Sequence, residues 1–113
     1  MKKSLWVTFA LLVLGMATEA SAANVWSDCV PTRVATFSNH VHVRCAASVS
    51  GGIFFFAVAT TDSAFAARFV SVASSAMIAG RPLQVWYDPA DLSGANFGCQ
   101  TNDCRRAQAL ELR

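Results

Sequence analysis

Four cysteines are the residues of this chain whose chemistry is easiest to predict. In an oxidising compartment, four cysteines indicate two disulfides, and four cysteines can be paired in three ways. Only four residues separate Cys99 from Cys104, and they are of turn-forming type. This spacing favours a local bridge and therefore the pairing Cys29–Cys45 with Cys99–Cys104. Each bridge would contribute about 2–4 kcal/mol, chiefly by restricting the unfolded chain.

A zinc site is the alternative use of the cysteines. The late Cys-x4-Cys pair, together with His40 and His42, contains residue types that bind zinc. An oxidising compartment favours disulfides instead. The two histidines also stand in an alternating strand, where they share an outward face with Arg44. We therefore expect neither a metal nor a cofactor.

Catalytic motifs are not evident in the sequence. It contains no Ser-His-Asp spacing signal and no glycine-rich phosphate loop. Asp88 and Asp91 have the types of a glycosidase pair, but neither lies in an apolar stretch that would raise the pKa of one carboxyl. We expect these two residues to shape a turn, and we predict that the protein is not an enzyme.

The N-terminus has the pattern of a secretory signal peptide. Lys2 and Lys3 precede an uncharged apolar run over residues 5–16, and Ala20-Ser21-Ala22 supplies the small residues that signal peptidase reads. The run is shorter than the roughly 20 residues that span a bilayer. The sequence thus predicts cleavage after residue 22 and a mature chain, residues 23–113, without a transmembrane anchor, secreted or periplasmic.

The mature chain is small and nearly neutral. Its 91 residues (113 minus 22) are enough for one domain. It carries seven arginines and six carboxylates, a net charge near +1. The Arg105-Arg106 pair is interpreted as a solvated strand end, so no nucleic-acid partner is expected. A chain of this size buries only about 60–65% of its unfolded surface, which predicts support from cross-links or oligomerisation.

One helix is predicted, and the remaining elements are arranged around it. Asp62 can cap its first turn, and Gly80 ends it. Between them, apolar residues recur at helical spacing on two adjacent lines. We therefore expect the helix to be covered over much of its circumference, by its own sheet and by a neighbouring subunit. The lines consist of Phe65, Phe69, Val72 and Ala76, and of Ala66, Val70, Ala73 and Met77.

Five strands are predicted, three before the helix and two after it. The first two form a hairpin through Ser38-Asn39, and the third is apolar on both sides, which indicates cover on both faces. In the second strand Val41, Val43 and Cys45 are expected to point inward. The predicted strands are residues 30–37, 40–47, 53–60, 83–87 and 106–112.

This order of elements indicates a mainly β fold with one helix. Three strands, a helix and two further strands are the layout of the OB-fold, a partly open five-stranded barrel. A small α+β sheet with the helix on one face is the alternative, and the pattern alone does not separate the two.

Four short motifs resemble the B subunits of the subtilase cytotoxin and typhoid toxin group. The motifs cover most of residues 26–104 and follow the order of that family. They are Trp26-Ser27, Ala79-Gly80 with Pro82, Trp86-Tyr87-Asp88-Pro89 and the late Cys-x4-Cys. These subunits are exported OB-fold proteins that form pentameric rings, bind sialylated cell-surface glycans and deliver an enzymatic A subunit. The resemblance implies a homopentameric lectin whose helices surround a central axis.

The resemblance also implies which residues bind the glycan. In the family, a Ser at the position of Ser27 and a Tyr at the position of Tyr87 contribute to the sialic-acid pocket. A hydroxyl can hydrogen-bond the sugar carboxylate, and a tyrosine offers a flat apolar face with a polar tip. The chain departs from the family at Ala23, where the pocket has an acidic residue, and at Phe54-Phe55-Phe56, where the family strand carries a Cys.

Two functions of other classes remain open on the sequence. One is a periplasmic or secreted structural or protein-interaction module that uses the same fold without binding sugar. The other is an inhibitor of an exported hydrolase that inserts the loop of residues 89–98.

Overall fold

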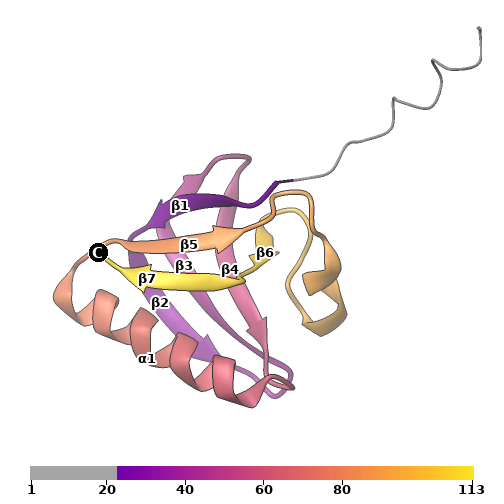
Figure 1. The fold of residues 1–113 in the computed structure, drawn as a ribbon, viewed down its shortest axis with the longest axis horizontal. Coiled ribbons are helices and arrows are strands. Elements are labelled where there is room, and N and C mark those ends of the chain that lie inside the picture. Colours follow the sequence, from indigo (N-terminus) through magenta and orange to yellow (C-terminus); the bar gives the residue numbers. More distant parts are fainter. Residues whose placement is uncertain (1–22) are drawn as a thin grey trace, which may run out of the picture.

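The computed structural model describes residues 23–113, which form a mainly β fold with one α-helix, as predicted (Figure 1). The predicted signal peptide, residues 1–22, lies outside the described residues. Within residues 23–113, no helix has the length and apolar character needed to cross a membrane.

The strands form two sheets. The four-stranded sheet has the order β2-β3-β4-β6, and the three-stranded sheet has the order β1-β5-β7. All neighbours are antiparallel except β4 and β6, which are parallel. Over residues 23–113 both sheets are open and do not close into a barrel. The bounds are β1 Val25–Cys29, β2 Pro31–Thr36, β3 His40–Val49, β4 Ile53–Ala59, β5 Leu83–Tyr87, β6 Cys104–Arg106 and β7 Ala109–Leu112.

The predicted count of five strands was wrong, because two long stretches each serve both sheets. The chain passes from β1 to β2 at Val30, whose carbonyl accepts a hydrogen bond from the Ala46 N–H (2.8 Å). It passes from β6 to β7 at Ala107 and Gln108. The Ala107 N–H still bonds into the four-stranded sheet, whereas the Gln108 N–H bonds to Trp86 in the other sheet, each at 2.9 Å.

The helix α1 (Ser63–Ala79) begins and ends where the sequence predicts. The Asp62 carboxylate accepts a hydrogen bond from the Phe65 N–H (3.4 Å), and Gly80 ends the helix in the left-handed conformation, with a φ of 66°. The helix buries Ala66, Phe69, Ala73 and Ala76. Its opposite face is exposed in the single chain, Ile78 to 84%, so the sheets of residues 23–113 cover one side of α1.

The core lies between the two sheets and α1. Val41, Val43 and Cys45 of β3 are buried there, as the alternation predicted, and Cys45 is disulfide-bonded to Cys29 at the end of β1. A second, smaller cluster on the opposite face of β4 contains Ala57 and the two late cysteines. Strand β4 is therefore covered on both faces, which confirms that prediction.

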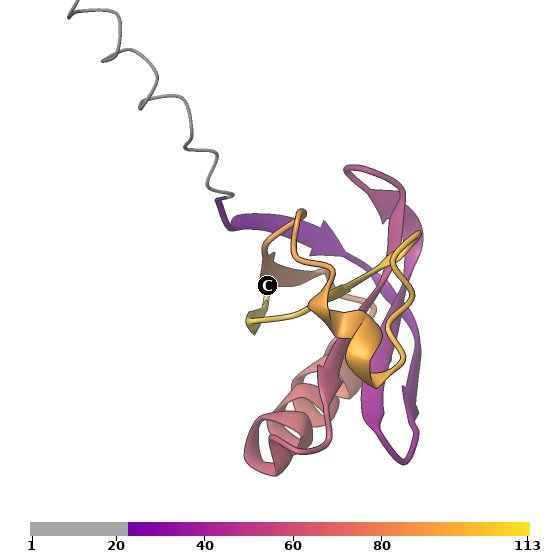
Figure 2. The same ribbon diagram turned by 90° about the vertical axis from the view of Figure 1, so that its right-hand side faces the viewer.

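The second cluster is covered by a loop that we call the η2 loop, residues 88–103, which contains the short 3-10 helix η2 (Ser93–Phe97). Figure 2 brings this loop to the front of the strands. The loop packs on the outer face of the four-stranded sheet and therefore shields part of that face from solvent.

Candidate functional site

Ser27 and Tyr87 lie side by side on neighbouring strands of the three-stranded sheet. Val25 is the direct partner of Tyr87 in the β1–β5 register, so Ser27 is diagonal to Tyr87 on the same face. Their hydroxyl oxygens are 3.3 Å apart. Ser27 is partly exposed, whereas Tyr87 is fully buried and meets the Phe56 ring edge-on at 4.8 Å. The ring of Tyr87 therefore offers no face to a sugar, contrary to expectation, and its hydroxyl contacts the partly exposed Ser27 from inside the core.

An aromatic pair occupies the opposite face of the same two strands. Trp26 stands directly opposite Trp86, and their ring centroids are 5.0 Å apart. Trp26 is 45% exposed. This pair was not predicted, because residues 25–29 were not expected to form a strand, although the alternation around Ser27 and Cys29 is a signal for one.

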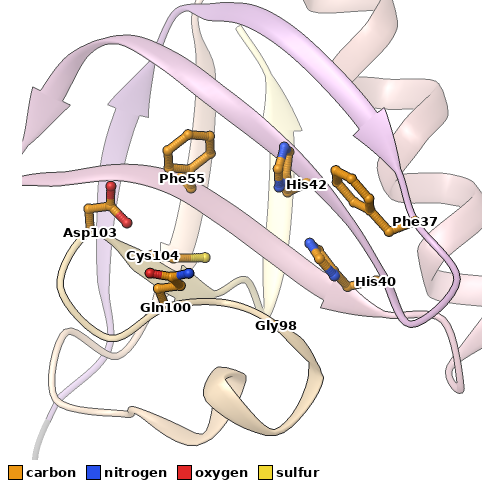
Figure 3. Close-up of a pocket in the computed structure, with 8 residues that line it drawn as sticks. All are labelled: Phe37, His40, His42, Phe55, Gly98, Gln100, Asp103 and Cys104. Atoms are coloured by element: carbon orange, nitrogen blue, oxygen red, sulfur yellow. The ribbon is translucent and has the colours of Figure 1, made fainter.

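A hollow of about 380 Å³ lies on the outer face of the four-stranded sheet, beside the η2 loop. Figure 3 shows the rings of Phe55, His42 and Phe37 in a row along the strands, with Gln100 and Asp103 reaching from the loop. We call this hollow the histidine pocket. Its lining residues are Phe37, His40, His42, Phe55, Gly98, Gln100, Asp103 and Cys104.

The two histidines of the pocket are packed among phenylalanines. The Phe37 ring stacks on His40 at a centroid distance of 4.7 Å, and His42 lies 5.1 Å from Phe37 and 5.0 Å from Phe55. His40 is only 9% exposed, and its Nδ1 is 2.8 Å from the side-chain oxygen of Asn39. Both histidines lie on the face of β3 opposite the main core, as predicted, but the η2 loop and Phe37 cover part of that face.

Burial keeps both imidazoles neutral near pH 7. Desolvation lowers the pKa of His40, and a hydrogen bond with the Phe97 backbone opposes that effect. Desolvation is also the largest cause that lowers the pKa of His42, followed by the charges of His40 and Arg33. Among the residues that the structure describes, the Nε2 atom of His42 is buried and has no hydrogen-bond partner. Such an atom in a hollow is a candidate functional group.

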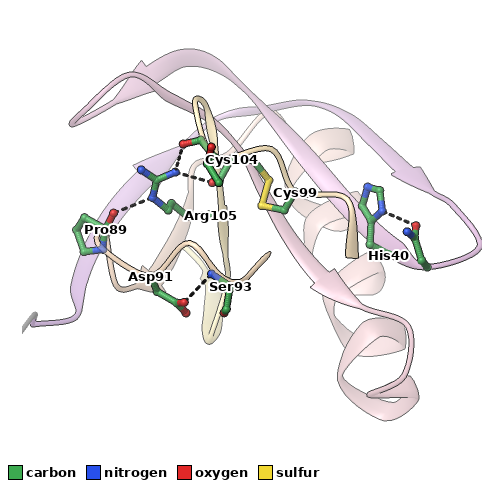
Figure 4. Close-up of a disulfide and its surroundings, with 9 residues drawn as sticks. His40, Pro89, Asp91, Ser93, Cys99, Cys104 and Arg105 are labelled. Atoms are coloured by element: carbon green, nitrogen blue, oxygen red, sulfur yellow. Dashed lines mark hydrogen bonds between the residues drawn. A yellow bond between two sulfur atoms is a disulfide. The ribbon is translucent and has the colours of Figure 1, made fainter. Parts of the chain in front are cut away.

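Arginines fasten the η2 loop (Figure 4). The Arg105 guanidinium donates hydrogen bonds of 2.7 Å to the carbonyl oxygens of Pro89, Thr101 and Cys104. Arg106 forms an ion pair of 3.2 Å with Asp91. The two arginines do stand at the end of β6 and are partly exposed, as interpreted, but both also hold the loop in place.

The two carboxylates considered for catalysis shape the start of the η2 loop, as expected. Asp88 Oδ1 accepts a hydrogen bond from the Ala90 N–H, and Asp91 Oδ1 accepts one from the Ser93 N–H, both at 2.9 Å. The hydrogen bond from the Ser93 side chain is the largest cause that lowers the pKa of Asp91, with Arg106 adding to it. This direction is opposite to that of a general acid.

The cysteines form the two disulfides favoured by the sequence, Cys29–Cys45 and Cys99–Cys104. None of the four therefore supplies a thiolate for the alternative zinc site. Across residues 23–113, no group of three potential metal-ligating side chains gathers. Figure 4 shows Cys99–Cys104 between the η2 loop and β6.

Neither the models of known protein families nor the curated proteins yield a match to this chain. Any functional assignment therefore depends on the site geometry together with the motif resemblance.

Proposed function

We propose that this protein is an exported, non-enzymatic lectin subunit with an OB-fold, similar to the toxin B subunits that its motifs resemble. The observation that carries the proposal is the 3.3 Å distance between the hydroxyls of Ser27 and Tyr87. These residues are sixty positions apart in the chain, yet their hydroxyls lie within hydrogen-bond distance, which supports the shared role that the resemblance implies. Ser27 hydrogen-bonds the sugar carboxylate, and Tyr87 orients the Ser27 hydroxyl from the core.

The connections between the sheets support the OB-fold part of the proposal. If β1 and β2 are counted as one bent strand, and β6 and β7 as another, five long strands remain. Each of these bent strands pairs in both sheets, through backbone hydrogen bonds at Val30 and at Ala107 and Gln108. A five-stranded, partly open barrel with such shared strands is the OB-fold architecture.

Exposed apolar residues support assembly into a homopentameric ring. They lie on β1 and β7, the two edge strands of the three-stranded sheet, and on the bend after β1. They are Val25, Trp26, Val30 and Leu112. Contact between two unlike edges repeats from copy to copy, and it closes into a ring when the rotation between neighbouring copies divides a full turn. Sedimentation of the purified protein at micromolar concentration tests this part, because a strict monomer would remove the ring and its A-subunit partner.

The two disulfides support export, since such bonds persist in oxidising compartments. Intact mass measurement of the protein recovered from the periplasm or the medium tests the cleavage site. An N-terminus at Ala23 agrees with export by a cleaved signal peptide, and an uncleaved protein in the reducing cytoplasm contradicts it.

A glycan array tests the lectin function. We expect the wild-type protein to bind sialylated glycans in preference to their desialylated counterparts. Ser27→Ala and Tyr87→Phe should lose this binding, whereas Ser74→Ala, which changes a partly exposed serine on α1, should retain it. Binding that survives Ser27→Ala would move the site elsewhere. Absence of sugar binding in a folded protein would favour the structural or protein-interaction module.

A further inference from the structure

We propose that the histidine pocket is a second ligand site and that it binds a neutral sugar ring. The pocket belongs to the four-stranded sheet and the η2 loop, whereas Ser27 and Tyr87 belong to the three-stranded sheet. The inference therefore goes beyond the proposed sialic-acid site and does not depend on it.

The size and the apolar part of the pocket fit a pyranose. A volume of about 380 Å³ lies within the usual range for small-ligand sites. Phe37 is 49% exposed although it stacks on His40, so part of its ring is available to a ligand. The flat apolar surface of an aromatic ring packs against the C–H face of a sugar by the same area burial that stabilises other aromatic contacts.

The polar groups of the pocket fit hydroxyls. Gln100 and Asp103 line the side formed by the loop. The amide of Gln100 can donate and accept hydrogen bonds, and the carboxylate of Asp103 accepts them. A hydroxyl can do both, so adjacent sugar hydroxyls can satisfy both side chains at once. The pocket thus presents aromatic rings on one side and hydrogen-bonding groups on the other.

The charges around the pocket favour a neutral ligand. The Arg44 guanidinium already lies over the rings of Phe54 and Phe55, at 5.3 and 5.9 Å, and would repel a cation there. Asp103 on the other side would repel an anionic sugar. The histidines are neutral near pH 7 because burial lowers the pKa of each. Charges of both signs, from Arg33 and Arg44 and from Asp103, thus surround the pocket, and a neutral ring avoids repulsion by either sign.

The walls of the pocket are held in place before any ligand arrives. The Cys99–Cys104 disulfide and the three hydrogen bonds of Arg105 fasten the loop side. The pairing of β3 with β4 fixes the strand side. Binding at such a site loses little conformational entropy, which offsets the small contact area of a single sugar.

NMR titration of the isotopically labelled protein tests the proposal. The probes are the methyl glycosides of glucose, galactose, mannose and N-acetylglucosamine, with methyl sialoside and cyclohexanol as comparison compounds. We expect at least one neutral glycoside to shift the amide signals of Gly98 and Gln100 in a saturable manner. A dissociation constant on the order of 1 mM is typical of a ligand with so few atoms.

Two variants locate the site. Gln100→Ala should weaken binding about 3- to 10-fold, the loss expected for one or two hydrogen bonds. Phe37→Ala should weaken it at least as much, because the exposed ring supplies the apolar face. Leu92→Ala is the matched control: Leu92 is also 49% exposed but does not line the pocket, so the affinity should not change. Spectra of each variant without ligand verify that it is folded.

Four results would overturn the inference. The first is the absence of saturable shifts with every neutral glycoside. The second is binding that Phe37→Ala and Gln100→Ala leave unchanged. The third is shifts that appear around Ser27 instead of Gly98. The fourth is equal or stronger binding of methyl sialoside or cyclohexanol at the pocket. These readouts are specific to each residue, so failure here is distinguishable from failure of the sialic-acid site.

Discussion

Gly98 of the η2 loop approaches His40 of β3 so closely that a side chain at Gly98 has no room. A Cβ atom there would lie 2.9 Å from Cε1 and 3.0 Å from Nδ1 of His40. Gly98 also has a φ of 104°, a conformation that residues with a side chain rarely adopt. Glycine at this position therefore lets the loop pack against the strand, and the contact fixes one wall of the histidine pocket.

Replacement of this glycine should be costly. We expect Gly98→Ala to lower the free energy of unfolding by about 2–4 kcal/mol, through backbone strain and the clash with His40. Gly52→Ala is the matched control, since Gly52 has a φ of 79° but no heavy atom within 4 Å of the added Cβ. It should lose only about 1 kcal/mol. Urea denaturation measures both, and equal losses would contradict the close contact.

The hydrogen bond between Ser27 and Tyr87 should show unequal effects on stability. Ser27→Ala leaves the hydroxyl of the fully buried Tyr87 without this partner, which costs about 1–3 kcal/mol. Tyr87→Phe leaves the hydroxyl on the partly exposed Ser27, where water can replace the bond, so the loss should be about 0.5–1.5 kcal/mol. Both substitutions remove one hydroxyl, but we expect Ser27→Ala to destabilise the protein more than Tyr87→Phe.

A double-mutant cycle measures this interaction directly. The variant with both substitutions should be more stable than the sum of the single losses predicts, because neither hydroxyl remains to be left unpaired. Thermal or urea unfolding of the four proteins supplies the values. Additive losses would mean that the two hydroxyls do not interact.

Local signals in the sequence were sufficient for several features. Asp62 and Gly80 predicted the ends of α1, because helix caps depend on residues next to the helix. The alternation of Val41 and Val43 predicted which face of β3 is buried, and the short Cys99–Cys104 spacing predicted a bridge. Each of these depends on contacts within a few residues or on strand periodicity.

Features that depend on distant contacts were not predictable in the same way. The alternating pattern near Ala107 and Gln108 does not reveal that the Ala107 N–H bonds to the four-stranded sheet and the Gln108 N–H to the three-stranded sheet. The strand pattern placed His40 and His42 on the outward face of β3. It says nothing about the η2 loop, which comes some fifty residues later and covers part of that face. The histidine pocket is therefore a product of tertiary packing.

The histidines of this pocket predict a dependence of stability on pH. Folding lowers the pKa of both His40 and His42, so the unfolded chain binds more protons once the pH falls below about 6.5. The free energy of unfolding should therefore decrease from about pH 7 downward, until the lowered pKa values are passed. Desolvation is the main cause of the lowered pKa of His42, and the charges of His40 and Arg33 add to it. Urea denaturation between about pH 7.5 and pH 5 measures the slope.

His42→Phe is the variant that separates this effect from the titration of carboxylates. It should make the pH slope shallower, because one of the two buried imidazoles no longer titrates. At pH 7.5 it should leave stability unchanged or raise it by up to about 1 kcal/mol, since it removes the buried Nε2 that lacks a partner in residues 23–113. An unchanged slope would show that protonation of His42 is not coupled to unfolding.

The two disulfides should contribute differently to stability and to the pocket. Cys29–Cys45 joins residues sixteen apart and Cys99–Cys104 residues five apart, so loop closure predicts losses of about 3 and 2 kcal/mol when each pair is replaced by alanines. Only loss of the late bridge loosens the η2 loop over His42. It should raise the pKa of His42 toward its ordinary value, as measured by NMR titration of the ring protons, because water then reaches the imidazole. Loss of the early bridge in a protein that remains folded should leave that pKa unchanged. If loss of Cys29–Cys45, and not loss of Cys99–Cys104, raised the pKa of His42, the late disulfide would not be what maintains the pocket.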